Sequence, residues 1–212
     1  MPSNPHSEDF DHDPAGDQGP VEIAIVGDLT DSESELTDRL LSVAPGEECT
    51  IYFDSPGGSP YCAMSLMSLI KLRRIRATGI VTGECSSATL WPFAACQRRV
   101  VTPYSVMLFH PMRWQSEENV GLAEAAEWAR HFGELERDMD HLLARMFNVD
   151  SDLMDSWINP GRYVMGAELA KAGIAEVLQF DELADLCPTA DREKDSHAAR
   201  QKAIRPAARR GN

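Results

Sequence analysis

The sequence predicts an α/β domain built on a largely parallel sheet, for three reasons. Short runs rich in β-branched residues alternate with stretches whose apolar residues recur at helical spacing. This strand–helix–strand order produces parallel strands joined by right-handed crossovers. A single long amphipathic stretch follows them and predicts one extended helix. All three observations fall in one region, about residues 21–183.

The expected elements follow one another without long gaps. Strands are assigned to β-branched and aromatic runs, helices to apolar spacings of three or four, and boundaries to Ser caps and Pro-Gly breaks. In chain order they are a strand at 22–26, a helix capped by Ser32 or Ser34 and ending at Pro45, a strand at 50–53, a helix around 63–70, a strand at 77–82, a helix starting near Ser87, strands at 99–102 and 105–109, a long helix at 122–147, a short helix at 166–172 and a strand at 174–178.

The long helix carries charges such as Glu124 and Arg130 on most of its surface and one apolar stripe. The stripe consists of Leu122, Ala126, Ala129, Phe132, Leu135, Met139, Leu142 and Met146.

Charge, apolar content and cysteine pattern exclude several classes of function. The net charge of -14 argues against nucleic acid and anionic membrane as main partners. No stretch reaches the roughly 18 to 20 apolar residues of a membrane span, and the start has no signal-peptide pattern, so we expect a cytoplasmic protein. The five cysteines form no C-x-x-C pair and sit mostly in apolar runs, so neither a metal site nor a disulfide framework nor a cofactor is predicted.

Both ends of the chain predict solvated tails. Residues 1–20 are acidic, rich in Pro and Gly, and too poor in apolar residues to fold, so we expect disorder. Residues 184–212 are basic in their later part and almost without large apolar side chains, and we expect disorder there too.

Three motifs stand at predicted strand ends. Residues 54–59 read DSPGGS, and successive free N–H groups at such a turn can bind negative charge. Residues 83–89 read GECSSAT, where a Ser at a sharp strand-to-helix corner can act as a nucleophile. Residues 106–111 read VMLFHP, where a strand-terminal His can act as a general base. Taken alone, each motif also fits a purely structural turn.

In combination, these motifs, in this order and at these separations, resemble the proteolytic subunit of the Clp protease, the ClpP family. The resemblance covers about residues 21–180 and is strong at the motifs and weak between them. It implies the crotonase-like fold of stacked ββα units with a protruding long helix. It also implies a homo-oligomeric ring, peptide or unfolded protein substrates and a Clp-type unfoldase ATPase as partner.

Residue by residue, the resemblance makes Ser87 the nucleophile, His110 its base, and the backbone N–H groups of Gly58 and Ala88 the oxyanion hole. These roles agree with the chemistry, because a weak hydroxyl needs an adjacent base and the tetrahedral oxyanion needs preorganised donors.

Two departures from the family pattern bear on catalysis and on assembly. The third triad member, an Asp in the family, corresponds to Gly161; Asn159 is the candidate that would orient His110 instead, and Asp155 is a more remote one. The family's Gly-rich strand that pairs two rings is replaced by residues 113–119. Trp114 in this segment is predicted to be exposed, either as an interface residue or as part of a substrate groove, and we favour the interface.

Several alternatives remain open. A catalytically weak ClpP-like ring subunit and a phage-type processing protease would share the Ser87–His110 dyad. A crotonase-fold acyl-CoA enzyme would use the same backbone N–H groups on a thioester, with Glu84 as the nearest acid. A Ser-Lys dyad would have to use Lys71.

Overall fold

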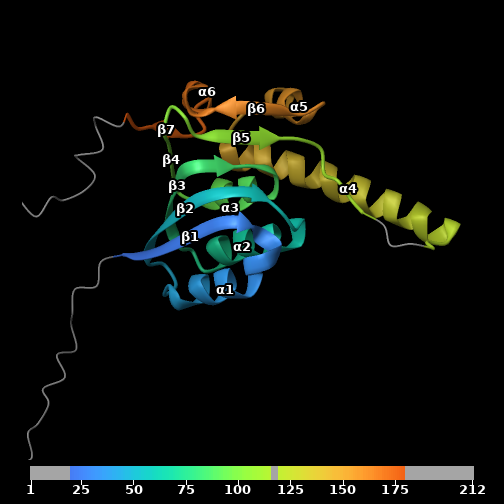
Figure 1. Ribbon diagram of the computed structural model, residues 1–212, viewed down its shortest axis with the longest axis horizontal. Coiled ribbons are helices and arrows are strands. Elements are labelled where there is room, and N and C mark those ends of the chain that lie inside the picture. The colour runs from blue at the N-terminus through green and yellow to red at the C-terminus, as the bar shows by residue number, and fades with distance from the viewer. Residues whose placement is uncertain (1–19, 116–118, 180–212) are drawn as a thin grey trace, which may run out of the picture.

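The computed structural model describes residues 20–115 and 119–179 (Figure 1). The predicted tail at 1–20 lies outside the described residues except for Pro20. The predicted tail at 184–212 and the end of the predicted domain at 180–183 also lie outside them. The extent of the domain and the nature of the tails therefore stay predictions.

The main sheet is parallel. Its strands run in the order β1 (Val21–Asp28), β2 (Glu48–Gly57), β3 (Arg76–Cys85), β4 (Arg98–Val101) and β7 (Glu176–Val177). Each neighbouring pair is parallel. The predicted α/β class with a largely parallel sheet is confirmed.

Two further strands leave this sheet at the end of β3. β5 (Val106–Phe109) runs parallel to β3, with Val106 paired to Glu84, and it pairs antiparallel with β6 (Arg162–Met165). The second sheet thus begins at the end of β3, and its strand β5 places residues 106–111 beside the corner at residues 83–89.

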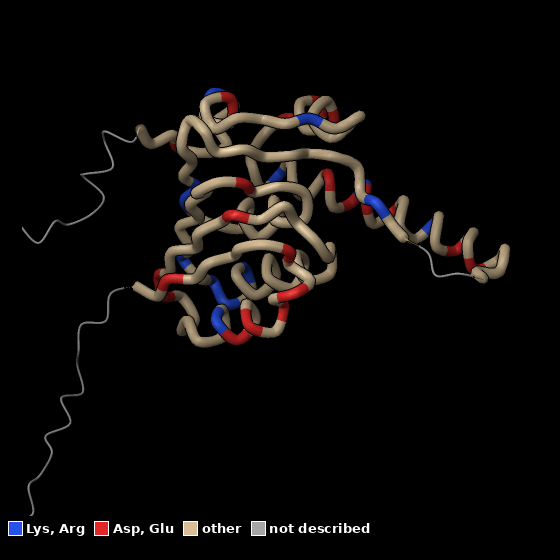
Figure 2. Tube along the Cα trace, in the orientation of Figure 1, with Lys and Arg blue, Asp and Glu red and all other residues tan. Residues whose placement is uncertain are grey.

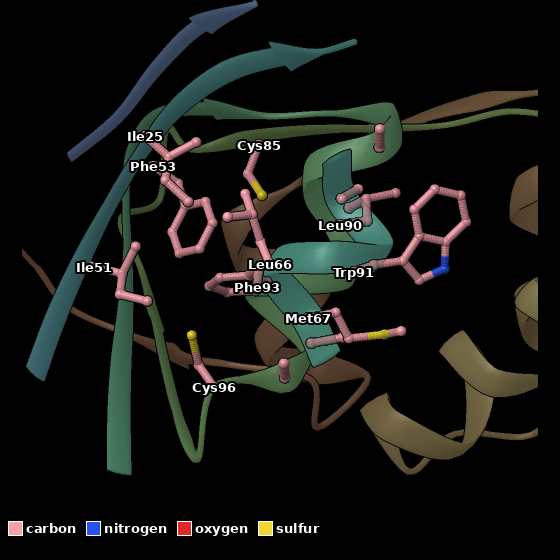
Figure 3. Packing of buried hydrophobic residues seen from close by; sticks show 14 of the residues in the cluster. Ile25, Ile51, Phe53, Leu66, Met67, Cys85, Leu90, Trp91, Phe93 and Cys96 are labelled. Carbon is pink, nitrogen blue, oxygen red and sulfur yellow. The ribbon is translucent and has the colours of Figure 1, made fainter. Parts of the chain in front are cut away.

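Helices α1 (Leu29–Ser42), α2 (Pro60–Leu72) and α3 (Leu90–Ala95) cover one face of the sheet. The burial of β2 alternates along the strand, so its apolar side chains all point to that face. Figure 3 shows Ile51 and Phe53 reaching from the sheet toward Leu66 and Phe93 of the helices, and all four are fully or almost fully buried.

The helix α4 (Leu122–Phe147) has the predicted bounds, but only its second half packs on the domain. Its buried residues are Met139, Leu143, Ala144 and Phe147. Leu122, the first residue of the predicted stripe, is 89% exposed, because the first half of the helix leaves the body of the molecule (Figure 1). Acidic and basic residues are interspersed along this projecting half (Figure 2).

Two sequence predictions need correction. The helix α1 begins at Leu29, capped by Asp28, whose Oδ1 accepts from the N–H of Thr30 at 2.8 Å, and not at Ser32 or Ser34. Trp114 is half-buried, because its ring stacks on Phe132 with the ring centroids 3.7 Å apart.

Two elements were not predicted at all, α5 (Ser151–Ile158) and the strand β6. The apolar spacing of Met154, Trp157 and Ile158 is the signal that marks α5. The strand β6 gave no such signal, since only Val164 of its four residues is buried. The last helix, α6, spans Gly166–Lys171, close to its predicted bounds.

Candidate active site

The carboxyl ends of β2, β3 and β5 meet at one edge of the molecule. Because these strands are parallel, the residues that follow each of them lie at the same edge. The three motifs singled out in the sequence each follow or end one of these strands. Residues distant in sequence are therefore brought together here.

Ser87 and His110 are in hydrogen-bonding contact. The Nε2 atom of His110 lies 2.8 Å from the Oγ atom of Ser87, and both residues are half-buried. A hydroxyl at this distance from an imidazole nitrogen can transfer its proton as it attacks an electrophile. The structure thus brings together the two residues that the sequence paired.

The backbone at Ser87 is in the left-handed region, with φ 56°. This conformation is uncommon for a residue other than glycine, and it is typical of sharp strand-to-helix corners that expose a nucleophilic hydroxyl. Ser87 begins a short 3₁₀ turn (Ser87–Thr89) that leads into α3. The corner therefore directs the side chain outward from the end of β3.

Hydrogen bonds that involve the buried residues Ser55, Ser86 and Thr89 hold the corner in place. The N–H of Ser86 donates to the carbonyl of Ser55 at 3.0 Å, and the hydroxyl of Thr89 donates to the carbonyl of Ser86 at 2.6 Å. The N–H of Leu108 donates to the Oγ of Ser86 at 2.9 Å, which ties β5 to the same corner. The ends of β2, β3 and β5 are thereby linked around Ser87.

Gly58 and Ala88, the predicted oxyanion donors, line the same cavity of about 190 Å³ as Ser87 and His110. A pair of backbone N–H groups beside a nucleophilic oxygen is what an oxyanion hole requires.

Asn159, the predicted orienting residue, is not brought to His110. Its Nδ2 donates to Oδ1 of Asp155 at 2.7 Å, so the two candidates for the third position bind each other. The Nδ1 atom of His110 lies 2.6 Å from the carbonyl oxygen of Pro111 instead. Gly161, which corresponds to the third triad position, does lie beside His110, since a Cβ added there would be 3.4 Å from the Cβ of His110.

Asp140 of α4 is a cavity residue to which the sequence analysis assigned no role. It lines the cavity with Ser87 and His110 on one side and an acidic groove with Glu136 and Asp155 on the other. Burial, helped by the charges of Glu136 and Asp155, raises the pKa of Asp140 to about 7. Its place between Met139 and Leu143, both buried, is the only sequence signal that points to it.

Other classes of site were also sought. Within residues 20–115 and 119–179, no group of three or more His, Cys, Asp or Glu side chains is arranged to hold a metal ion. In the same residues, no helix has the length and apolar character needed to cross a membrane.

Comparison with known proteins agrees with the geometry. No family model matches the chain. The chain is 28% identical over 133 residues to the ATP-dependent Clp protease proteolytic subunit of Bacteroides thetaiotaomicron, an alignment that includes 61% of this chain. The chain spans 59% of the length of that relative. Taken with the motifs, this similarity makes the chain a distant homologue of the ClpP proteolytic subunit, and so a divergent ClpP-like protein.

Proposed function

We propose that this chain is a serine endopeptidase of the ClpP type. The observation that carries the proposal is the 2.8 Å contact between Oγ of Ser87 and Nε2 of His110, at a corner where Ser87 has a positive φ. The proposed fold is accordingly the crotonase-like arrangement of stacked ββα units with a protruding helix, here α4.

In the proposed mechanism, Ser87 Oγ attacks the peptide carbonyl while Nε2 of His110 accepts the hydroxyl proton. The N–H groups of Gly58 and Ala88 stabilise the oxyanion of the tetrahedral intermediate. His110 then returns the proton to the departing amine, which leaves an acyl-enzyme on Ser87. A water molecule, deprotonated by His110, attacks the acyl carbonyl, and its proton is returned to Ser87 Oγ as the product acid departs.

The remaining parts of the proposal follow from the ClpP likeness. The chain would act in the cytoplasm as a homo-oligomeric ring on peptides or unfolded proteins, supplied by a Clp-type unfoldase ATPase. The central domain would end near residue 183, with an acidic tail before it and a basic tail after it.

One observation favours a second candidate, a catalytically weak ClpP-like ring subunit. Gly161 stands where the family has its third triad residue, and Asn159 is bound to Asp155 rather than to His110. An imidazole without a fixed orientation would lose much of its value as a base. The two candidates differ in the reactivity of Ser87.

A fluorophosphonate probe followed by native mass spectrometry tests both. The endopeptidase is supported if the assembled protein takes up one probe per chain at Ser87 and hydrolyses a fluorogenic peptide. Ser87→Ala should lose labelling and hydrolysis, and Ser34→Ala, an exposed serine of α1, should keep both. Hydrolysis at the parent level in Ser87→Ala would remove Ser87 from the mechanism. An assembled ring without labelling would select the weak subunit.

A further inference from the structure

One peptide unit, between Pro111 and Met112, lies between His110 and α4. Its carbonyl oxygen is 2.6 Å from Nδ1 of His110, and its N–H donates to Oε1 of Glu136 at 2.6 Å. In a trans peptide the C=O and N–H bonds point in opposite directions. Glu136 and His110 therefore bind the two ends of a single peptide.

The carbonyl end determines which nitrogen of His110 carries a proton. A carbonyl oxygen only accepts, so Nδ1 must be the protonated nitrogen in this contact. The neutral ring then has its lone pair on Nε2, which faces the hydroxyl of Ser87 at 2.8 Å. This is the tautomer that can accept the proton of the nucleophile.

The carboxylate end fixes the orientation of the peptide. A hydrogen bond to an ionised acceptor is roughly twice as strong as one between neutral groups. Hydrogen bonds in series also polarise one another, so the carboxylate makes the Pro111 carbonyl a better acceptor. The pyrrolidine ring of Pro111 restricts the same segment further.

Glu136 differs from Glu127 and Glu134 of the same helix. Glu127 and Glu134 are exposed and both pair with Arg130, so their charges are already matched on the surface. Glu136 is half-buried and accepts from the backbone N–H of Met112. Its side chain thus faces the segment that follows His110.

We propose that Glu136 is a positioning residue for His110, acting through the 111–112 peptide. In this arrangement the backbone carbonyl of Pro111, held by Glu136, orients the imidazole in place of a third side chain. The inference rests on the proposed function for its catalytic consequence. The tautomer of His110, however, is a property of the protein whether or not it cleaves peptides.

The test compares Glu136→Ala and Glu136→Gln with Glu134→Gln, a matched control on the same helix. Peptide hydrolysis is measured as kcat and KM. The tautomer of His110 is read from the ¹⁵N chemical shifts of its ring in ¹⁵N-histidine-labelled protein by magic-angle-spinning NMR, which suits large assemblies. A His110→Gln variant assigns the signal.

We expect the parent to hold the Nδ1–H tautomer. Glu136→Ala should show a mixture with the Nε2–H tautomer and a fall in kcat of about tenfold or more, with KM nearly unchanged. Glu136→Gln, which keeps an acceptor oxygen without the charge, should lie between parent and Ala, and Glu134→Gln should match the parent.

Three results would overturn the inference. The first is an Nε2–H tautomer in the parent protein. The second is a Glu136→Ala variant that keeps both the tautomer and the kcat of the parent. The third is a fall in kcat with an unchanged tautomer, since the loss would then be structural. If the parent proves inactive on peptides, the proposed function fails, and the NMR comparison alone still decides the role of Glu136.

Discussion

A Cβ atom placed on Gly57 would lie 2.7 Å from the Cβ of Ser87. It would also lie 3.0 Å from the carbonyl oxygen of Ser86 and 3.1 Å from the N atom of Ala88. Gly57 has φ 112°, a conformation that L side chains rarely adopt. The diglycine turn is therefore required both by its own backbone and by the neighbouring corner that carries the nucleophile.

Gly57→Ala should displace the Ser87 corner and slow labelling by a fluorophosphonate. A loss of stability of about 1 to 3 kcal/mol should accompany it, because the clash adds to an unfavourable φ. Probe labelling rates and urea unfolding check both effects. Gly133→Ala on α4, where an added Cβ meets nothing within 4 Å, is the control and should be neutral or stabilising. Equal behaviour of the two variants would contradict the steric argument.

Asp140→Asn should change how stability depends on pH. The pKa of Asp140 is raised to about 7 in the folded protein from 3.8, so the folded state binds this proton more tightly than the unfolded state. Its contribution is fully present below about pH 4 and is lost as the pH rises through 7. After allowance for partial exposure, the variant should be about 1 to 2 kcal/mol more stable than the parent above pH 7.

The two proteins should be nearly equal in stability below pH 4. Unfolding by urea at a series of pH values measures the difference between them, so that the other titrating groups cancel. A difference that stays constant with pH would show that Asp140 keeps an ordinary titration in the folded state.

Phe147→Ala should be strongly destabilising. The Phe147 ring is fully buried, packs against Phe93 and Phe109, and lies under the guanidinium of Arg99. Truncating such a side chain typically costs about 3 to 5 kcal/mol. Leu122→Ala, at the exposed start of the same helix, should change the stability of the isolated subunit by less than about 0.5 kcal/mol. Urea unfolding of both variants tests whether only the second half of α4 supports the fold.

Four cysteines should resist alkylation in the native protein. Burial raises the pKa of Cys49 and of Cys62 to about 11, with Glu33 and Asp28 adding to the effect at Cys62. Burial also raises the pKa of Cys85 and Cys96 well above the ordinary value. Since the thiolate is the reactive form, iodoacetamide at pH 8 should modify these residues only after denaturation. Peptide mapping by mass spectrometry resolves each site, and rapid native labelling of any of the four would contradict the burial described here.

The class of fold was predictable from the order of strands and helices, and the pairing of Ser87 with His110 from the resemblance of the three motifs to the ClpP family. Residues after parallel strands must gather at one edge, whatever the details of packing between them. The cap of α1 was missed because Asp28 is also the last residue of β1, so the helix follows the strand without a connecting loop in which a cap would be sought. The exposed start of α4 was missed because spacing gives the face of a helix and not the length over which a neighbour covers it.

The environment of His110 was harder to predict for a different reason. The sequence search sought a side chain for its Nδ1 atom and found Asn159, whereas the structure places the carbonyl of Pro111 there. Every residue has a carbonyl, so no residue type marks such a contact. Glu136 was missed for the same reason, because it binds a backbone N–H and not a side chain.

The hydrogen bonds that join Ser55, Ser86 and Leu108 also affect how the protein unfolds. Ser86 donates to the carbonyl of Ser55 and accepts from the N–H of Leu108, so we expect the ends of β2, β3 and β5 to open together. The amide protons of Ser86 and Leu108 should consequently exchange with solvent as slowly as those in the middle of the sheet. Heat or denaturant would then separate Ser87 from His110 in the same cooperative step that unfolds the core. No partly inactivated species should precede that step.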